Sequence, residues 1–216
     1  MHLLLAQPGE TTDGSEAVDL EQSPADVIVI SAADTELAGL AEARSTMDAP
    51  PSLRLASLMH LAHPMSVDLY LDQTACKSKL VIARVLGGGG YWSYGLEQFA
   101  ARLGEAGIAF AALPGDDKPD AELLRASTVS DADWHQLWAY FVEGGPENMT
   151  AALETARAIA DGVEERPAPA RPLLRAEYTG QVAASPIWKQ RGLVGVIPML
   201  RLCQSFSTGR SCRGPG

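Results

Sequence analysis

The stretch KLVIARVLGGGGYWSYG, residues 79–95, shows most clearly how this chain folds. Residues 80–86 are apolar except for Arg84, which predicts a buried strand. Four consecutive glycines end that strand, and the residues after them begin a helical pattern with one apolar face. A strand, a small-residue loop and a helix in this order form the repeating unit of an open parallel sheet.

The same unit recurs on both sides of this stretch. Further strands are predicted by apolar runs at 2–7, 25–30 and 108–113 and by alternating apolar and polar residues at 53–58. Helical patterns follow most of them. We therefore predict an α/β fold with an open, mainly parallel sheet flanked by helices over residues 1–165. A Pro-rich linker over 166–175 and an irregular tail over 176–216 should follow.

Two helix starts can be predicted from capping residues. Ser66 follows Pro64 and is expected to cap a helix over residues 67–74. Ser130 and Asp133 have the spacing of a capping box in front of a helix with Trp134 on its apolar face. A last helix is expected over about residues 147–161.

Charge is distributed unevenly along the 216 residues. Residues 1–166 carry 10 Lys and Arg against 26 Asp and Glu, a net charge of −16, whereas residues 167–216 carry a net charge of +6. The acidic body argues against nucleic-acid binding, which needs a basic surface. No apolar run approaches the ~20 residues that a membrane span requires. Three cysteines without metal-site spacing favour a reducing compartment, so we expect a cytoplasmic protein.

The glycine run supplies the first candidate site. Gly88 and Gly89 lie between a strand and a helix, where main-chain N–H groups could hold an anion, although a flexible turn is the alternative. The run is neither GxGxxG nor a P-loop, so nucleotide-binding fingerprints are missing. Tyr91 and Trp92 could stack on a flat ligand, but Trp92 also fits the buried face of the helix.

A second candidate loop follows the strand at 108–113. Asp116 and Asp117 could bind a metal ion or hydrogen-bond a ligand, or could be solvated turn residues beside Pro114. His60 and His63 are spaced as two ligands on a helix could be, yet Pro64 interrupts such a helix. The sequence therefore assigns no metal site and no catalytic residue.

Several phrases together resemble the large subunit of aerobic cobaltochelatase, the CobN family, which is related to the magnesium chelatase H subunit. They cover roughly residues 1–175 in the family's order. These phrases are MHLLLAQ (1–7), EAVDLEQSPADVIVISAADTEL (16–37), PSLRLASL (51–58), HPMSVDLY (63–70), RVLGGGGYWSYG (84–95), ALPGDDKPD (112–120) and LWAYFVEGGPEN (137–148).

The resemblance implies a function that the residues alone do not. The family inserts Co²⁺ as a substrate into hydrogenobyrinic acid a,c-diamide during aerobic cobalamin synthesis. An AAA+ motor subunit and its companion subunit use ATP and Mg²⁺, and the large subunit binds the tetrapyrrole.

Family members are several times longer than 216 residues. We therefore expect an N-terminal fragment that is inactive alone, with no cofactor of its own. The alternatives are a non-catalytic tetrapyrrole-binding or docking module and a magnesium chelatase H-type subunit.

The tail departs from the family. Codons permitted for residues 176–182, read two bases later, give Gly-Ile-Tyr-Trp-Pro-Gly, a phrase that the family has after its Pro-rich linker. Codons for residues 202–213 recover a later family phrase at the same offset. The sequence thus predicts a frameshift near Ala176, with residues 176–216 out of frame.

Overall fold

The computed structural model describes residues 4–5, 16–172, 176–178 and 200–202. Its centre is a four-stranded sheet in the order β4–β3–β5–β6, and all three pairings are parallel. The predicted α/β fold with a parallel sheet is therefore confirmed. The four strands are β3 (Val27–Ser31), β4 (Leu53–Ser57), β5 (Leu80–Val85) and β6 (Ala109–Pro114).

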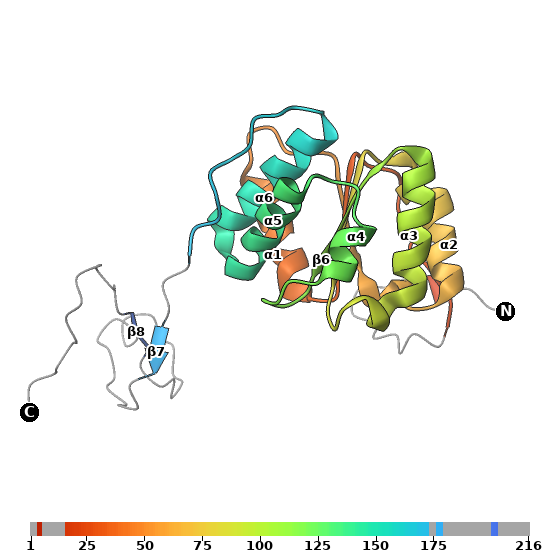
Figure 1. Cartoon of the computed structure of the whole chain (residues 1–216), viewed down its shortest axis with the longest axis horizontal. Helices are drawn as coiled ribbons and strands as arrows, with labels where there is room; N and C mark the ends of the chain where they lie inside the picture. The colour runs from red at the N-terminus through yellow and green to blue at the C-terminus, as the bar shows by residue number, and fades with distance from the viewer. Residues whose placement is uncertain (1–3, 6–15, 173–175, 179–199, 203–216) are drawn as a thin grey trace, which may run out of the picture. The chain divides into compact units, whose positions relative to one another are not determined.

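Helices cover both faces of this sheet. In Figure 1, α2 and α3 lie on one side of the sheet, and α1, α5 and α6 lie on the other. The short helix α4, which the sequence did not predict, follows β6. The helices are α1 (Asp34–Thr46), α2 (Pro64–Gln73), α3 (Ser93–Ala106), α4 (Ala121–Ala126), α5 (Asp131–Glu143) and α6 (Gly145–Ala160), with 3₁₀ turns η1 (Leu58–Leu61), η2 (Ala75–Lys77) and η3 (Gly89–Trp92).

The strands divide their side chains between two apolar clusters. In β5, Val81 and Ala83 belong to the cluster with α2 and α3, whereas Leu80 and Ile82 belong to the cluster with α1, α5 and α6. All residues of β3 and β5 are buried, as expected for central strands covered on both faces. Because successive side chains of a strand point to opposite faces of the sheet, the position of a residue along the strand determines which helical layer it contacts.

One predicted helix cap is confirmed and the other is wrong. The Ser130 hydroxyl accepts a hydrogen bond from the Asp133 N–H at 3.1 Å, as a capping residue does. Helix α2, however, begins at Pro64 and is capped by His63, whose Nδ1 accepts from the Met65 N–H at 3.1 Å. Proline suits the first helical position, so the helix starts earlier than Ser66.

The chain separates into two compact units, Met1–Arg171 and Pro172–Gly216, and this boundary falls inside the predicted linker. In the first unit, β1 (Leu4–Leu5) pairs in parallel with β2 (Val18–Asp19). In the second unit, β7 (Ala176–Tyr178) and β8 (Leu200–Leu202) form an antiparallel pair. The rest of the predicted irregular tail lies outside the described residues.

Candidate functional site at the carboxyl edge of the sheet

Parallel α/β sheets bind ligands at the carboxyl ends of their strands, most often where the strand order reverses. Here the reversal lies between β3 and β5, because the chain passes from β3 to the outer strand β4 and then returns to β5 on the other side. Ser31 and Arg84 are register partners at this position. Ser31 and Arg84 therefore lie at the centre of the candidate site.

A buried ion pair occupies the reversal point. Arg84 Nη2 donates to Glu36 Oε1 at 2.8 Å, and the two side chains are only 3% and 16% exposed. The Ser31 hydroxyl donates to the other carboxylate oxygen of Glu36 at 2.7 Å, and the Arg84 guanidinium lies 4.9 Å from the centroid of the Phe141 ring. The cavity left beside the pair is about 60 Å³. Small-molecule pockets are usually several times larger, so this crevice is filled by the chain's own side chains.

The two predicted glycines lie beside carboxylates. Gly88 has φ 77° and ψ −178°, a conformation that is essentially limited to glycine. A Cβ on Gly88 would lie 3.0 Å from Asp120 Oδ2, and a Cβ on Gly89 would lie 2.9 Å from the carboxyl carbon of Glu122. The glycines therefore let the loop pass close to the start of α4. These neighbouring negative charges disfavour an anionic ligand at the loop.

The neighbouring aromatic residues differ in burial. Trp92 is 4% exposed, its Nε1–H donates to the carbonyl of Leu61 at 2.8 Å, and its ring lies 5.2 Å from that of Phe99. Trp92 is thus a core residue, which was the alternative that the sequence left open. Tyr91 is 60% exposed and its hydroxyl lies 3.9 Å from Met59 Sδ.

Tyr91 and Met59 form an exposed apolar contact that we call the edge patch. Leu86 is a further exposed apolar residue at this end of the sheet, beside Arg84 and Gly115. Met59 follows β4 in η1, and Leu86 follows β5; they are 36% and 53% exposed. Exposed apolar side chains that gather at one place often mark an interaction site. The sequence analysis missed Met59 and Leu86, although their positions directly after strands place them at the ligand-binding edge.

The predicted aspartates lie in an exposed loop after β6. The Asp116 carboxylate accepts from the Lys118 N–H at 3.2 Å, and the Asp116 carbonyl accepts from Trp138 Nε1 at 3.0 Å. Asp117 is also exposed. The first of these contacts is an ordinary Asx-type turn, so the loop is well formed without a ligand.

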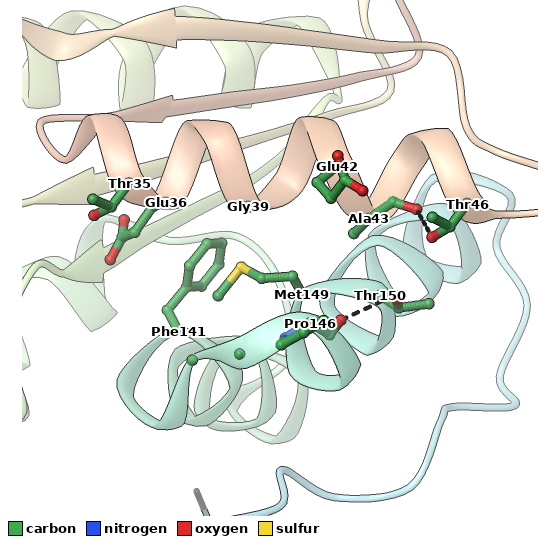
Figure 2. A pocket seen from close by; sticks show the side chains of 12 residues that line it. Thr35, Glu36, Gly39, Glu42, Ala43, Thr46, Phe141, Pro146, Met149 and Thr150 are labelled. Carbon is green, nitrogen blue, oxygen red and sulfur yellow. Dashed lines mark hydrogen bonds between the residues drawn. The ribbon is translucent and has the colours of Figure 1, made fainter. Parts of the chain in front are cut away.

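A larger groove lies beside the reversal point, between α1 and the start of α6 (Figure 2). Its volume is about 640 Å³, and Glu36 and Phe141 contribute to its wall. Figure 2 shows Phe141 and Met149 between the two helices. The groove escaped the sequence analysis because α1 and α6 are distant in sequence. The remaining lining residues are Thr35, Gly39, Glu42, Ala43, Thr46, Gly144, Gly145, Pro146 and Thr150.

Within the described residues, no group of three or more His, Cys, Asp and Glu side chains is placed to hold a metal ion. His63 instead serves as the cap of α2. Burial raises the pKa of the Cys76 thiol, which makes this cysteine a poor nucleophile near neutral pH. Nor does any helix in this part of the chain combine the length and the apolar character needed to cross a membrane.

Two curated proteins are similar to the chain in sequence. The aerobic cobaltochelatase subunit CobN of Sinorhizobium sp is 47% identical over 210 residues, which are 97% of this chain and 16% of the relative. The subunit of the same name from Pseudomonas aeruginosa is 40% identical over 149 residues, which are 68% of this chain and 12% of the relative. The chain therefore spans about a sixth or less of the length of these relatives. No family model matches the chain.

One solved structure is similar in fold. The catalytic subunit of cobaltochelatase from Mycobacterium tuberculosis matches with a TM-score of 0.56 and 21% identity, over 69% of this chain and 11% of that one. At this identity the likeness shows the fold alone, and it supports the α/β architecture described above.

The sequence comparison also bears on the tail. An alignment that covers 97% of the chain must extend into residues 176–216. The 47% identity is an average over the aligned residues and gives no separate figure for the tail. The frameshift stays a prediction that resequencing of the gene would test.

Proposed function

Because the predicted resemblance to the CobN family is confirmed, we propose that this chain is part of the large subunit of an ATP-dependent cobaltochelatase. The observation that carries the proposal is the 47% identity to a CobN subunit along nearly the whole chain. The reaction is the insertion of Co²⁺ into hydrogenobyrinic acid a,c-diamide. An AAA+ motor subunit and its companion subunit use ATP and Mg²⁺ in this reaction. These two subunits are the protein partners in this proposal.

We propose further that this chain does not catalyse chelation by itself. The observation that supports this view is that the chain spans 16% of its Sinorhizobium relative. The catalytic groups would then lie elsewhere in the large subunit. A non-catalytic binding or docking role is the second candidate, and the exposed edge patch favours it. Both sequence relatives are cobalt enzymes by name, which favours cobalt over a magnesium chelatase role.

The carboxyl edge is the proposed contact for the tetrapyrrole. The exposed Tyr91 ring and its neighbour Met59 offer an apolar surface to the flat macrocycle, and Leu86 is another exposed apolar side chain at this edge. Asp116 and Asp117 would accept hydrogen bonds from the amide groups of the diamide, while repelling its carboxylates.

A chelation assay tests the catalytic part of the proposal. The chain is mixed with the two partner subunits, ATP, Mg²⁺, Co²⁺ and the diamide, and cobalt insertion is followed by absorbance. We expect no turnover from this chain and turnover when a full-length large subunit replaces it. Turnover from the 216-residue chain would contradict the non-catalytic assignment, and no turnover from the full-length subunit would contradict the chelatase assignment.

Titration with the diamide tests the binding part. Trp92 lies next to Tyr91 in sequence, so its fluorescence should report a ligand at the edge patch. We expect weak, saturable quenching that is lost in Tyr91→Ala and kept in the matched control Tyr94→Phe. Quenching that survives both Tyr91→Ala and the Asp116→Ala/Asp117→Ala pair would exclude this edge as the binding site.

A further inference from the structure

The segment after α6 is held against the body by side chains, although its composition predicts a free linker. We call residues 163–171, VEERPAPAR, the strap. Gly162 has φ 68°, and the Val163 N–H donates to the carbonyl of Ala158 at 2.9 Å, which is the geometry of a helix-ending turn. In Figure 1 the segment that leaves α6 runs back beside α5 and α6.

Three side chains of α5 and α6 bind the main chain of the strap. The amide of Gln136 donates to the carbonyl of Pro167 at 2.9 Å, and the Tyr140 hydroxyl donates to the carbonyl of Ala168 at 2.7 Å. Asn148 both donates to the carbonyl of Arg171 at 2.8 Å and accepts from its N–H at 2.9 Å. Such paired contacts bind the backbone of an extended peptide much as a neighbouring strand would.

Burial and contacts within the domain fix the positions of these three side chains. Tyr140 is fully buried and Asn148 is 3% exposed. Gln136 also donates to the Tyr140 hydroxyl at 2.6 Å, so the two groups orient each other. A buried Asn or Tyr without a partner is costly, so the strap satisfies polar groups that the body could not leave empty.

Two acidic side chains bind the two arginines of the strap. Arg166 Nε donates to Asp133 Oδ1 at 2.6 Å, and its Nη2 donates to the other oxygen at 3.2 Å, so the guanidinium forms a two-pronged contact. The two side chains of this pair are only 21% and 15% exposed. Arg171 reaches Glu147 at 2.9 Å, but that pair is largely exposed and contributes little.

From these contacts we propose that the α5–α6 face is a peptide-binding site for an extended segment containing Arg and Pro, and that the strap occupies it in cis. The main-chain contacts bind an extended peptide of any sequence, and Asp133 selects an arginine. Prolines suit such a ligand because a Pro-rich segment is already extended and loses little entropy on binding. The site is separate from the carboxyl edge, and the proposal does not depend on the chelatase function.

A binding experiment in trans tests the proposal directly. The receptor is the full chain with residues 163–171 replaced by a Gly/Ser segment of equal length, and the probe is a labelled synthetic peptide of residues 163–171. We expect saturable binding by fluorescence anisotropy. An Arg166→Ala peptide should bind about ten-fold more weakly, because a charge-assisted contact is lost. The matched control, Glu165→Ala, should bind as the parent peptide does.

Two results of this binding experiment would contradict the proposal. Absence of saturable binding to a receptor with native circular dichroism would overturn the proposal, as would equal binding of the Arg166→Ala and parent peptides. Because the peptides carry the substitutions, no change in their affinity can be attributed to misfolding of a variant receptor.

A second measurement uses the unaltered full chain, in case the Gly/Ser receptor does not fold. The Arg171 N–H is bound by Asn148, so its hydrogen exchange should be slow compared with that of the Ala170 N–H. Asn148→Ala should accelerate exchange at Arg171 to the rate of a free peptide, whereas Glu154→Ala on the same helix should not. Equal exchange rates at positions 170 and 171 in the unaltered chain would overturn the proposal.

Discussion

The glycine run at 87–90 and the strap at 163–171 lead to opposite lessons. The glycine run has the form of a ligand-binding loop, yet in the structure its shape is accounted for by contacts within the domain, such as those of Gly88 and Gly89 with α4. The strap has the composition of a linker, yet five side chains of α5 and α6 bind it. The local composition of a segment indicates how flexible its backbone can be. Contacts with side chains that are distant in sequence determine whether the segment is held in place.

The largest effect should come from removing the anchor of the glycine run. Trp92→Ala removes a buried indole and its hydrogen bond to Leu61, and should lower the free energy of unfolding by about 3–5 kcal/mol. The matched control is Tyr91→Ala, which removes an exposed ring and should cost less than about 0.5 kcal/mol. Urea denaturation of both variants measures the difference, and equal losses would contradict the assignment of Trp92 to the core.

The next effect should arise in the strap. Asn148→Ala removes the paired contact with Arg171 and a hydrogen bond to the carbonyl of Gly144, and should cost about 1–3 kcal/mol. The strap should also become sensitive to elastase at the bond between Ala170 and Arg171, because both arginines of the strap precede a proline and resist trypsin. Glu154→Ala serves as the control on the same helix. If the two variants are cleaved in the strap at the same rate, Asn148 does not hold this segment.

A smaller effect distinguishes the glycines from one another. Gly88→Ala forces a side chain into a backbone region reserved for glycine, and should destabilise the domain by about 1–2 kcal/mol. Gly90 has no atom within 4 Å of an added Cβ and lacks a positive φ, so Gly90→Ala should be close to neutral. Thermal denaturation can compare the two. A neutral Gly88→Ala would mean that the loop conformation is not required by the fold.

The smallest effect should be a pH dependence of the strap. The hydrogen bond from Arg166 holds the pKa of Asp133 below its ordinary value. A carboxyl group with a lowered folded-state pKa stabilises the protein fully above its unfolded pKa of about 3.9. That contribution is lost as the pH falls from about 4 through the lower folded-state value. The rate at which an acid-stable protease cleaves the strap, compared between pH 6 and pH 3, measures this loss. Asp133→Asn should remove the pH dependence of that rate.

The sheet could be predicted from the sequence because its strands are mostly apolar runs, or an apolar–polar alternation at 53–58, between polar loops. The runs at 25–30, 53–58 and 108–113 all became strands of the parallel sheet. Helix boundaries were less certain, as α2 shows: Pro64 at the first helical position outweighed the capping preference of Ser66. The helix α4 was missed because six residues are too few for a clear apolar period.

The site was harder to predict because it depends on contacts between distant segments. The sequence gives no sign that Glu36 reaches Arg84, 48 positions later, and fills the crevice at the reversal of strand order. It also gives no sign that Met59 lies against Tyr91. The carboxyl edge as a whole was predictable, because the ends of parallel strands always meet there.

The strap also determines where force would enter this domain. Helix α6 is 16 residues long, about 24 Å, and Asn148 in its first turn holds Arg171, so the chain leaves from the start of this helix rather than from its end. A pull on the chain beyond Arg171 would therefore load the Asn148 contact first, then the contacts at Ala168 and Pro167, and only afterwards the helix. The contacts of the strap would then break one after another before force is applied at the carboxyl end of α6.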